Sequence, residues 1–122
     1  MVYSISAVDG EPAALDAVFA ALAHQSRRDL VVYLARRSRP PRMTEVAVDN
    51  DLSPQLLNKH TAALEKAGLV HRERRGRERY LVLDAAALAD AQAWIRDTRA
   101  FWEVQFESLD AYIRTLKGDA DA

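Results

Sequence analysis

The chain has 122 residues, of which 49% are hydrophobic and 29% are charged, a composition typical of a globular domain with a real core. It contains no cysteine, which excludes disulfide bonds, thiolate catalysis and thiolate metal sites. Residues 27–83 carry 13 basic and 7 acidic side chains, whereas both flanking segments are acidic, so the net charge of −1 conceals a basic middle that is available to bind phosphates.

The N-terminal part of the chain predicts a short arm over residues 1–11 and then two helices. It lacks the basic residues and long apolar core of a signal peptide, and no apolar run reaches the roughly 18 residues of a membrane span, so we expect a cytoplasmic protein without membrane contact. Apolar residues recur at helical spacing from Pro12 to Ala23. They recur again after Ser26, whose spacing from Asp29 resembles a capping box.

Residues 44–68 are typical of a helix-turn-helix, with a short helix over residues 44–50, a tight turn, and a second helix. The turn lacks glycine, so we expect Asn50 or Asp51 to adopt a positive φ. Ser53 is a good N-cap for the second helix, Pro54 suits its first position, and Gly68 provides a left-handed stop. In the DNA-binding form of this motif, the second helix lies in the major groove.

The second helix has two distinct faces. Successive residues 100° apart put Leu57, Thr61 and Leu64 on an inward stripe. The outward face then consists of the polar, basic or small residues Gln55, Asn58, Lys59, Ala62 and Lys66. Glutamine and asparagine can pair with adenine, and lysine can reach guanine or phosphate, so this face can read bases. Taken alone, the segment fits an ordinary solvated surface helix equally well.

Residues 69–83 predict a β-hairpin that turns at Gly76. Five arginines and two glutamates lie within residues 70–80, with Arg74, Arg75 and Arg77 at the tip and Arg72 and Arg79 flanking it. A basic hairpin next to a helix-turn-helix is typical of the wing of a winged-helix protein. The alternative is a solvated hairpin whose charge has no binding role.

No proline or glycine interrupts residues 84–116, which predicts one long helix capped by Asp84. Some thirty residues at 1.5 Å per residue span roughly 45 Å, more than a domain of this size needs to cover its own core. Apolar positions recur about every 3.5 residues, which favours packing against a second copy of the chain. The expected dimer interface comprises Leu15 and Phe19 of the first helix and Leu88, Ile95, Trp102, Leu109 and Tyr112 of the long helix. The alternative is a core helix that folds back on its own chain.

This order of elements resembles the ArsR family of prokaryotic winged-helix transcription repressors. Residues 19–28, FAALAHQSRR, are similar to the family's opening F-x-A-L-A-D-P-T-R-R, and residues 52–60, LSPQLLNKH, are similar to its L-S-x-x-x-V-S-x-H. The long helix, with Trp94, Phe101, Trp102 and Leu109, looks like that of the metal-independent subgroup. His24 and Gln25 stand where the family has Asp-Pro, Asn58 where serine is usual, and Thr61 where an apolar residue is usual.

The resemblance implies a mainly α fold with a small β-hairpin, the winged helix-turn-helix. Residues 12–83 would form its core and wing, and residues 84–116 would form a dimerisation helix of the same domain. It implies a sequence-specific transcriptional regulator that binds double-stranded DNA as a homodimer and represses by occluding its operator. Carried over by position, the DNA-contacting residues are Thr44, Ser53, Gln55, Asn58, Lys59, His60 and the wing residues Arg72, Arg74, Arg75 and Arg77.

Other functions have less support. The short helix has no cysteine pair and the long helix no histidine, so we expect no metal site; we also expect no cofactor. We also expect no enzymatic activity, because the sequence shows no glycine-rich phosphate loop, no nucleophile with a nearby base and no paired carboxylate site. Two alternatives remain open: a protein-interaction module that uses the aromatic long helix, and a pocket for an unknown small-molecule effector at the dimer seam. The pocket residues would be Trp94, Phe101, Trp102 and Phe106, which aromatic core packing explains as well.

Overall fold

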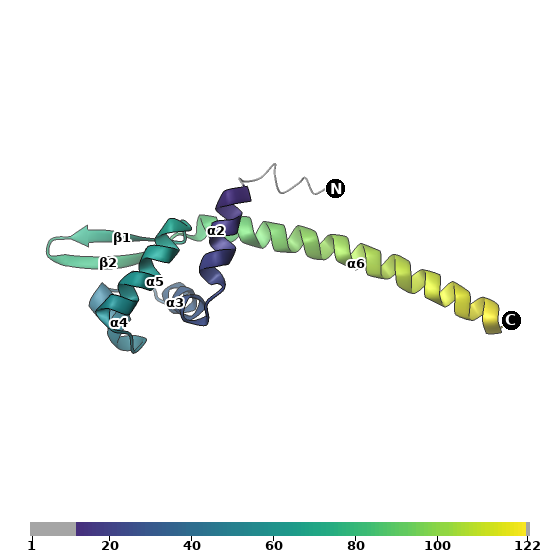
Figure 1. The fold of residues 1–122 in the computed structure, drawn as a ribbon, viewed down its shortest axis with the longest axis horizontal. Helices are drawn as coiled ribbons and strands as arrows, with labels where there is room; N and C mark the ends of the chain where they lie inside the picture. The colour runs from purple at the N-terminus through teal and green to yellow at the C-terminus, as the bar shows by residue number, and fades with distance from the viewer. Residues whose placement is uncertain (1–11, 122) are drawn as a thin grey trace. The chain divides into compact units, whose positions relative to one another are not determined.

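A computed structural model describes residues 12–121 of the chain, and side chains from residue 14 to residue 118. The predicted arm over residues 1–11 lies outside the described residues. The elements follow in the order predicted (Figure 1): α2 (Pro12–Leu22), α3 (Gln25–Ala35), α4 (Met43–Asp49), α5 (Pro54–Lys66), β1 (Val70–Arg75), β2 (Glu78–Leu83) and α6 (Ala85–Asp121). They divide between Ala91 and Gln92 into two units, which we describe separately. None of the helices in the described part is long and apolar enough to cross a membrane.

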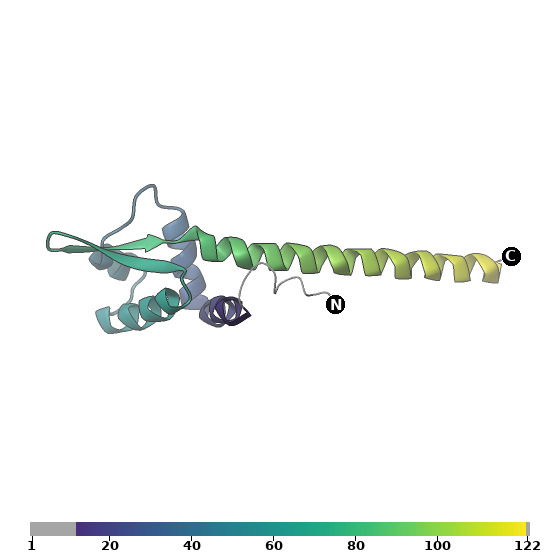
Figure 2. The same cartoon turned by 90° about the horizontal axis from the view of Figure 1, so that it is seen from above.

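Helix α5 is the central element of the first unit. It contacts α2, α3, α4 and β1, while α4 and α3 also contact β2. Seen from above in Figure 2, α5 runs beside the hairpin. The fully buried side chains come from every layer of this unit and include Leu30, Val46, Leu64, Leu69 and Leu81, none of which exposes measurable surface. The apolar face predicted for α5 therefore forms the middle of the core.

The hairpin is antiparallel and pairs Val70 with Leu83 at its base and Arg75 with Glu78 at its tip. Gly76 has a φ of +63° and is followed by Arg77 with a negative φ, the pattern of a two-residue type II′ turn that matches the twist of the strands. The backbone N–H of Leu81 donates to the Pro41 carbonyl over 3.0 Å, so the loop before α4 is joined to the side of β2 that faces away from β1.

The turn between α4 and α5 confirms the expected left-handed residue. Asp51 has a φ of +54°, the only non-glycine residue of the described chain with a positive φ. Asn50 keeps a φ of −108° and instead donates its side-chain amide to the Val46 carbonyl over 2.8 Å. The Leu52 N–H donates to the Ala47 carbonyl over 2.9 Å and closes the turn. A short polar side chain tolerates this backbone conformation, so glycine is not needed here.

Two local predictions were wrong. Helix α3 begins at Gln25, with His24 as an extended N-cap whose side chain makes no capping bond, so Ser26 lies inside the first turn and forms no capping box with Asp29. Helix α6 does not end near Leu116 but continues through Gly118 to Asp121. A glycine inside a helix costs only about 1 kcal/mol relative to alanine, which the surrounding helical residues can offset.

The second unit consists of the part of α6 after Ala91, with most side chains between Gln92 and Gly118 exposed in the single chain. Its exposed residues include a series of large apolar side chains: Trp94, Ile95, Phe101, Trp102, Val104, Phe106, Leu109, Tyr112, Ile113 and Leu116. Trp102 packs against Phe106, with 5.9 Å between ring centroids. On the polar side, Arg99 pairs with Glu103 one turn later over 2.8 Å. This helix is therefore amphipathic, with an exposed apolar stripe.

Candidate nucleic-acid interface

Helix α5 begins and ends as its sequence predicts. The Ser53 hydroxyl accepts from the Leu56 N–H over 3.1 Å, and Pro54 occupies the first helical position where no N–H is needed. At the other end, Ala67 is the C-cap and Gly68 adopts a φ of +75°. Local contacts therefore fix where α5 begins and ends. Its buried side chains decide which face of the helix points toward the core.

The inward stripe of α5 confirms which face is left for a partner. Leu57 is 2% exposed, and Thr61 and Leu64 are fully buried. The side chains on the opposite face are all exposed: Gln55, Asn58, Lys59, Ala62 and Lys66. No acidic residue lies among them, so the exposed face of α5 carries amide donors and acceptors and two positive charges.

Asn58 is oriented by the neighbouring strand. Arg72 on β1 donates from Nη1 to the Asn58 Oδ1 over 3.2 Å, and its Nε lies 3.2 Å from a Glu65 carboxylate oxygen. Since an arginine only donates, the Asn58 oxygen faces Arg72 and its NH₂ group points the other way. The structure thus presents Asn58 as a donor. It also gives Arg72, predicted as a DNA contact, a second role in joining β1 to α5.

His60 does not lie on the exposed face. Its side chain is only 8% exposed, and the Arg27 Nε donates to its Nδ1 over 3.4 Å. Burial, and then the nearby Arg27 charge, lower the pKa of His60, so the ring is neutral at neutral pH. The structure therefore gives no support to the DNA contact implied for His60 and favours a partly buried core residue. The sequence held this signal, because His60 is one helical turn from Leu57 and Leu64.

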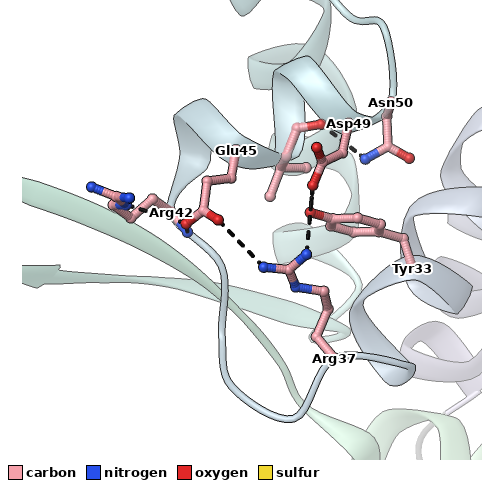
Figure 3. A network of polar contacts seen from close by, with 7 residues as sticks. Tyr33, Arg37, Arg42, Glu45, Asp49 and Asn50 are labelled. Atoms are coloured by element: carbon pink, nitrogen blue, oxygen red, sulfur yellow. Dashed lines mark hydrogen bonds and ion pairs between the residues drawn. The ribbon is translucent and has the colours of Figure 1, made fainter.

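Helix α4, which carries the exposed Thr44, is held by a polar network (Figure 3). Tyr33 on α3 donates to an Asp49 carboxylate oxygen over 2.5 Å, and Arg37 lies 3.4 Å from Glu45 and 3.5 Å from Asp49. Burial and the hydrogen bond to Asp49 raise the pKa of Tyr33 to about 12, so it remains a donor. Ion pairs this exposed add little stability. Their effect is geometric, because they fix α4 against the end of α3.

Arg42, the residue before α4, connects this network to the wing. Its backbone N–H donates to Glu45 over 3.2 Å, its Nε donates to the same oxygen over 3.1 Å, and its Nη1 lies 4.0 Å from Glu78. These bonds lower the pKa of Glu45 and keep it ionised. Arg42 also bridges to Tyr80 through the backbone. The start of α4 is thereby joined to β2, so the helix-turn-helix and the wing form one assembly.

The strand register places the wing arginines on two faces. Residues directly opposite each other share a face, so Arg72, Arg74 and Arg79 lie on the face that also carries the buried Val70 and Leu81. The other face carries Arg75, whose guanidinium lies 3.0 Å from Glu73 and 5.0 Å from the Tyr80 ring centroid. Arg75 is therefore partly neutralised in the free protein.

Three wing arginines have no acidic partner among the described residues. Arg74 donates only to the Gly76 carbonyl, over 3.2 Å, and no hydrogen bond or ion pair is seen for Arg77 or Arg79 in that part of the chain. Arg74 and Arg79 are directly opposite each other, a like-charge pairing that costs stability unless an anion lies nearby. Arg79 was not among the predicted site residues, although its position in the sequence close to the hairpin tip could have indicated that it belongs with the other wing arginines.

The residues predicted for a dimer interface fall into two groups. Leu15, Phe19 and Leu88 are partly buried and pack against the core of their own chain. By contrast, Ile95, Trp102, Leu109 and Tyr112 are each at least half exposed in the single chain. Their contact with a second copy stays a prediction.

The described residues contain no group of three histidine, cysteine, aspartate or glutamate side chains that could hold a metal ion. His71 is the histidine nearest to carboxylates, with Nδ1 2.8 Å from Asp84 and Nε2 3.3 Å from Glu73. Hydrogen bonds to these two acids raise its pKa. Both ring nitrogens are thus engaged in ion pairing, with the arrangement of an imidazolium rather than a metal ligand.

Comparison with known proteins gives one clear outcome. No family model matches the chain, and no curated protein matches it. Among solved structures, an ArsR family transcriptional regulator is 28% identical with a TM-score of 0.68, over 77% of this chain and 95% of its own. A possible transcriptional regulator for arsenical resistance is 32% identical with a TM-score of 0.56, over 67% and 80%. A homodimeric winged helix-turn-helix DNA-binding domain from Mycobacterium bovis is 21% identical with a TM-score of 0.56, over 72% and 82%, a likeness of fold.

Proposed function

The chain belongs to the ArsR family of winged helix-turn-helix transcriptional regulators, and on this premise we propose that it binds a specific DNA operator as a homodimer and represses transcription by occlusion. The observation that carries the proposal is the exposed face of α5, whose side chains are amides, lysines and alanine, bordered by the wing arginines, with Glu65 at its edge paired with Arg72. Amide and lysine side chains on such a face can read base edges, and the arginines can bind phosphates on either side.

The residues divide into two roles. Gln55, Asn58 and Lys59 read bases, with Asn58 acting as a donor because Arg72 occupies its oxygen. Thr44, Ser53, Arg74, Arg75 and Arg77 contact the backbone of the DNA. Arg72 acts mainly by holding β1 against α5. Backbone contacts set affinity and register, whereas base contacts set sequence preference.

The exposed apolar stripe of α6 supports the homodimer. Ile95, Trp102 and Leu109 follow one another at intervals of seven residues and are each at least half exposed, which is the pattern of a helix that packs against another helix. The Mycobacterium bovis domain is described as homodimeric. A two-fold dimer would place two α5 helices in successive major grooves, about 10 base pairs apart.

We propose that the chain belongs to the metal-independent subgroup. It has no cysteine, and its three histidines lie outside α6. The cysteine and carboxylate–histidine sites that metal-sensing members use therefore cannot be assembled from its residues. Loss of DNA binding on addition of Zn²⁺, restored by a chelator, would overturn this assignment.

The direct test is binding of the purified protein to fragments of the DNA upstream of its own gene, titrated with salt and with unrelated competitor DNA. We expect one fragment to resist competitor and to weaken steeply with salt. Equal affinity for all fragments would refute sequence-specific binding. No binding at low salt would refute the proposal as a whole and favour a protein-interaction module that uses the aromatic face of α6.

Two variants test the α5 face. Lys59→Ala and Gln55→Ala should each reduce discrimination between operator and mutated operator by about 5- to 150-fold, because both side chains read a base. The charge removed with Lys59 should also lower the salt slope by up to about 0.9 per protomer. Lys117→Ala, an exposed lysine on α6, is the matched control and should leave both quantities unchanged. Unchanged sequence preference in both α5 variants would show that this face does not read DNA.

A further inference from the structure

A groove of about 620 Å³ lies between α4, the start of α5 and the hairpin. Its apolar lining comes from both helices of the motif and the turn between them: Met43, Ala47, Val48, Leu52, Pro54 and Leu57. Its polar lining includes Thr44, Asn58 and the two wing arginines Arg72 and Arg79. This volume, and an apolar lining with a few polar groups at the rim, are typical of sites for small organic molecules.

The charge of the groove points to the kind of molecule. Arg72 is committed to Glu65 and Asn58, whereas Arg79 has no acidic partner among the described residues and faces Arg74 across the strands. The acidic side chain that lines the groove, Asp51, lies at the far turn and makes no ion pair with Arg79. An arginine in this position is ready to receive a carboxylate through two parallel hydrogen bonds.

We propose that this groove binds a small amphipathic carboxylate. The carboxylate pairs with Arg79, and the aliphatic or aromatic body of the ligand lies against Ala47, Leu52 and Leu57. A DNA backbone is a poorer occupant, because phosphates and sugars would satisfy the arginine but would leave the apolar lining in contact with polar groups. The site is distinct from the α6 stripe, since all its residues belong to the first unit.

Occupancy of the groove has a consequence that rests on the proposed function. Thr44 and Asn58 line the groove and also belong to the proposed DNA-binding surface. A ligand held there therefore competes with DNA for the same side chains, and each should weaken the other by the same factor. This makes the groove a site at which a metabolite releases the regulator from its operator.

The first experiment measures ligand binding without DNA. The ¹⁵N-labelled protein is titrated with 4-phenylbutyrate and, separately, with the uncharged 4-phenylbutyramide, which has the same apolar body. We expect saturable chemical-shift changes at Ala47, Leu57, Asn58 and the Arg79 Nε, and binding of the carboxylate about tenfold tighter than that of the amide. No saturable change for either probe, equal affinity for both, or changes spread over all exposed arginines would overturn the proposal.

The variant Arg79→Gln should remove the preference for the carboxylate, whereas Arg77→Gln, a matched exposed arginine in the same hairpin that does not line the groove, should retain it. Loss of the preference in both variants would overturn the assignment to Arg79. Because this readout uses no DNA, it is independent of the proposed function. The second experiment adds 4-phenylbutyrate to the operator complex, and an unchanged operator affinity at saturating ligand would refute the competition while leaving the ligand site in place.

Discussion

Replacement of the buried Thr61 with valine should stabilise the protein. Thr61 exposes none of its surface, and its Oγ1 has no hydrogen-bond partner. A buried hydroxyl without a partner costs about 1–3 kcal/mol, because it loses its bonds to water and gains none in return. Valine has nearly the same shape and the same branching at Cβ, so the helix loses no further side-chain freedom. We therefore expect Thr61→Val to raise the free energy of unfolding by about 1–2 kcal/mol.

Urea unfolding followed by circular dichroism measures this change. The protein concentration is held constant, because the stability of a dimer depends on it. With a denaturant slope of about 2 kcal/mol per molar, the middle of the range for small proteins, the midpoint should rise by roughly 0.5–1 M. The matched control is Thr115→Val on α6, where the hydroxyl is exposed and donates to the Ala111 carbonyl over 3.0 Å. It should change the stability by less than about 0.5 kcal/mol.

The reasoning is refuted if Thr61→Val leaves the midpoint unchanged or lowers it while the control behaves as expected. That result would mean that the hydroxyl is satisfied in the folded protein, for example by a buried water molecule. Operator affinity should be the same in the wild type and in Thr61→Val, because Thr61 lies on the buried side of α5.

Three further predictions follow from the same structure. An NMR titration should give His71 a pKa above its ordinary value of about 6.5, and Asp84→Asn should lower that pKa. The stability that this contact contributes is present below pH 6.5 and is lost as the pH rises through the raised pKa. A pKa of His71 at or below 6.5 would contradict the ion pair. The pKa of His60 is lowered in the folded protein, so as the pH falls the unfolded chain binds this proton at a higher pH than the folded chain does. The free energy of unfolding should therefore fall as the pH drops below about 6.5, and His60→Gln should remove that fall. Trp102→Glu should give a monomer in light scattering, because it puts a charge in the apolar stripe of α6. A variant that dimerises with unchanged affinity would mean that the stripe is not the dimer interface.

The parts of the structure that the sequence predicted are those that depend on neighbouring residues. Ser53, Pro54 and Gly68 mark the ends of α5 through bonds and dihedral angles within a few residues, and all three behave as expected. Asp51 in the turn and Gly76 in the hairpin also follow from local backbone preference. The capping box predicted at Ser26 is wrong because the helix begins two residues earlier, with His24 as N-cap and Arg27, not an acid, at the third helical position.

The parts that the sequence did not predict depend on contacts between distant segments. The pairing of Arg72 with Glu65 and Asn58 requires β1 to lie beside α5. The sequence does not indicate which acidic or amide side chain will contact a given arginine. The strand register likewise decides that Arg79 shares a face with Arg74. His60 is a different case, because its helical position already placed it near Leu57. The family motif led to the opposite assignment.

The loop before α4 has a further consequence for the hairpin. A two-stranded ribbon has two open edges, and an open edge is a template on which strands of other molecules can add. Here the Pro41 carbonyl accepts from the Leu81 N–H and Arg42 bridges to Tyr80, so the outer edge of β2 is already occupied over part of its length. The free edge of β1 is rich in arginine, which opposes the approach of another copy. The wing can thus stay exposed for DNA without seeding aggregation, and the colloidal stability of the protein depends in part on this loop.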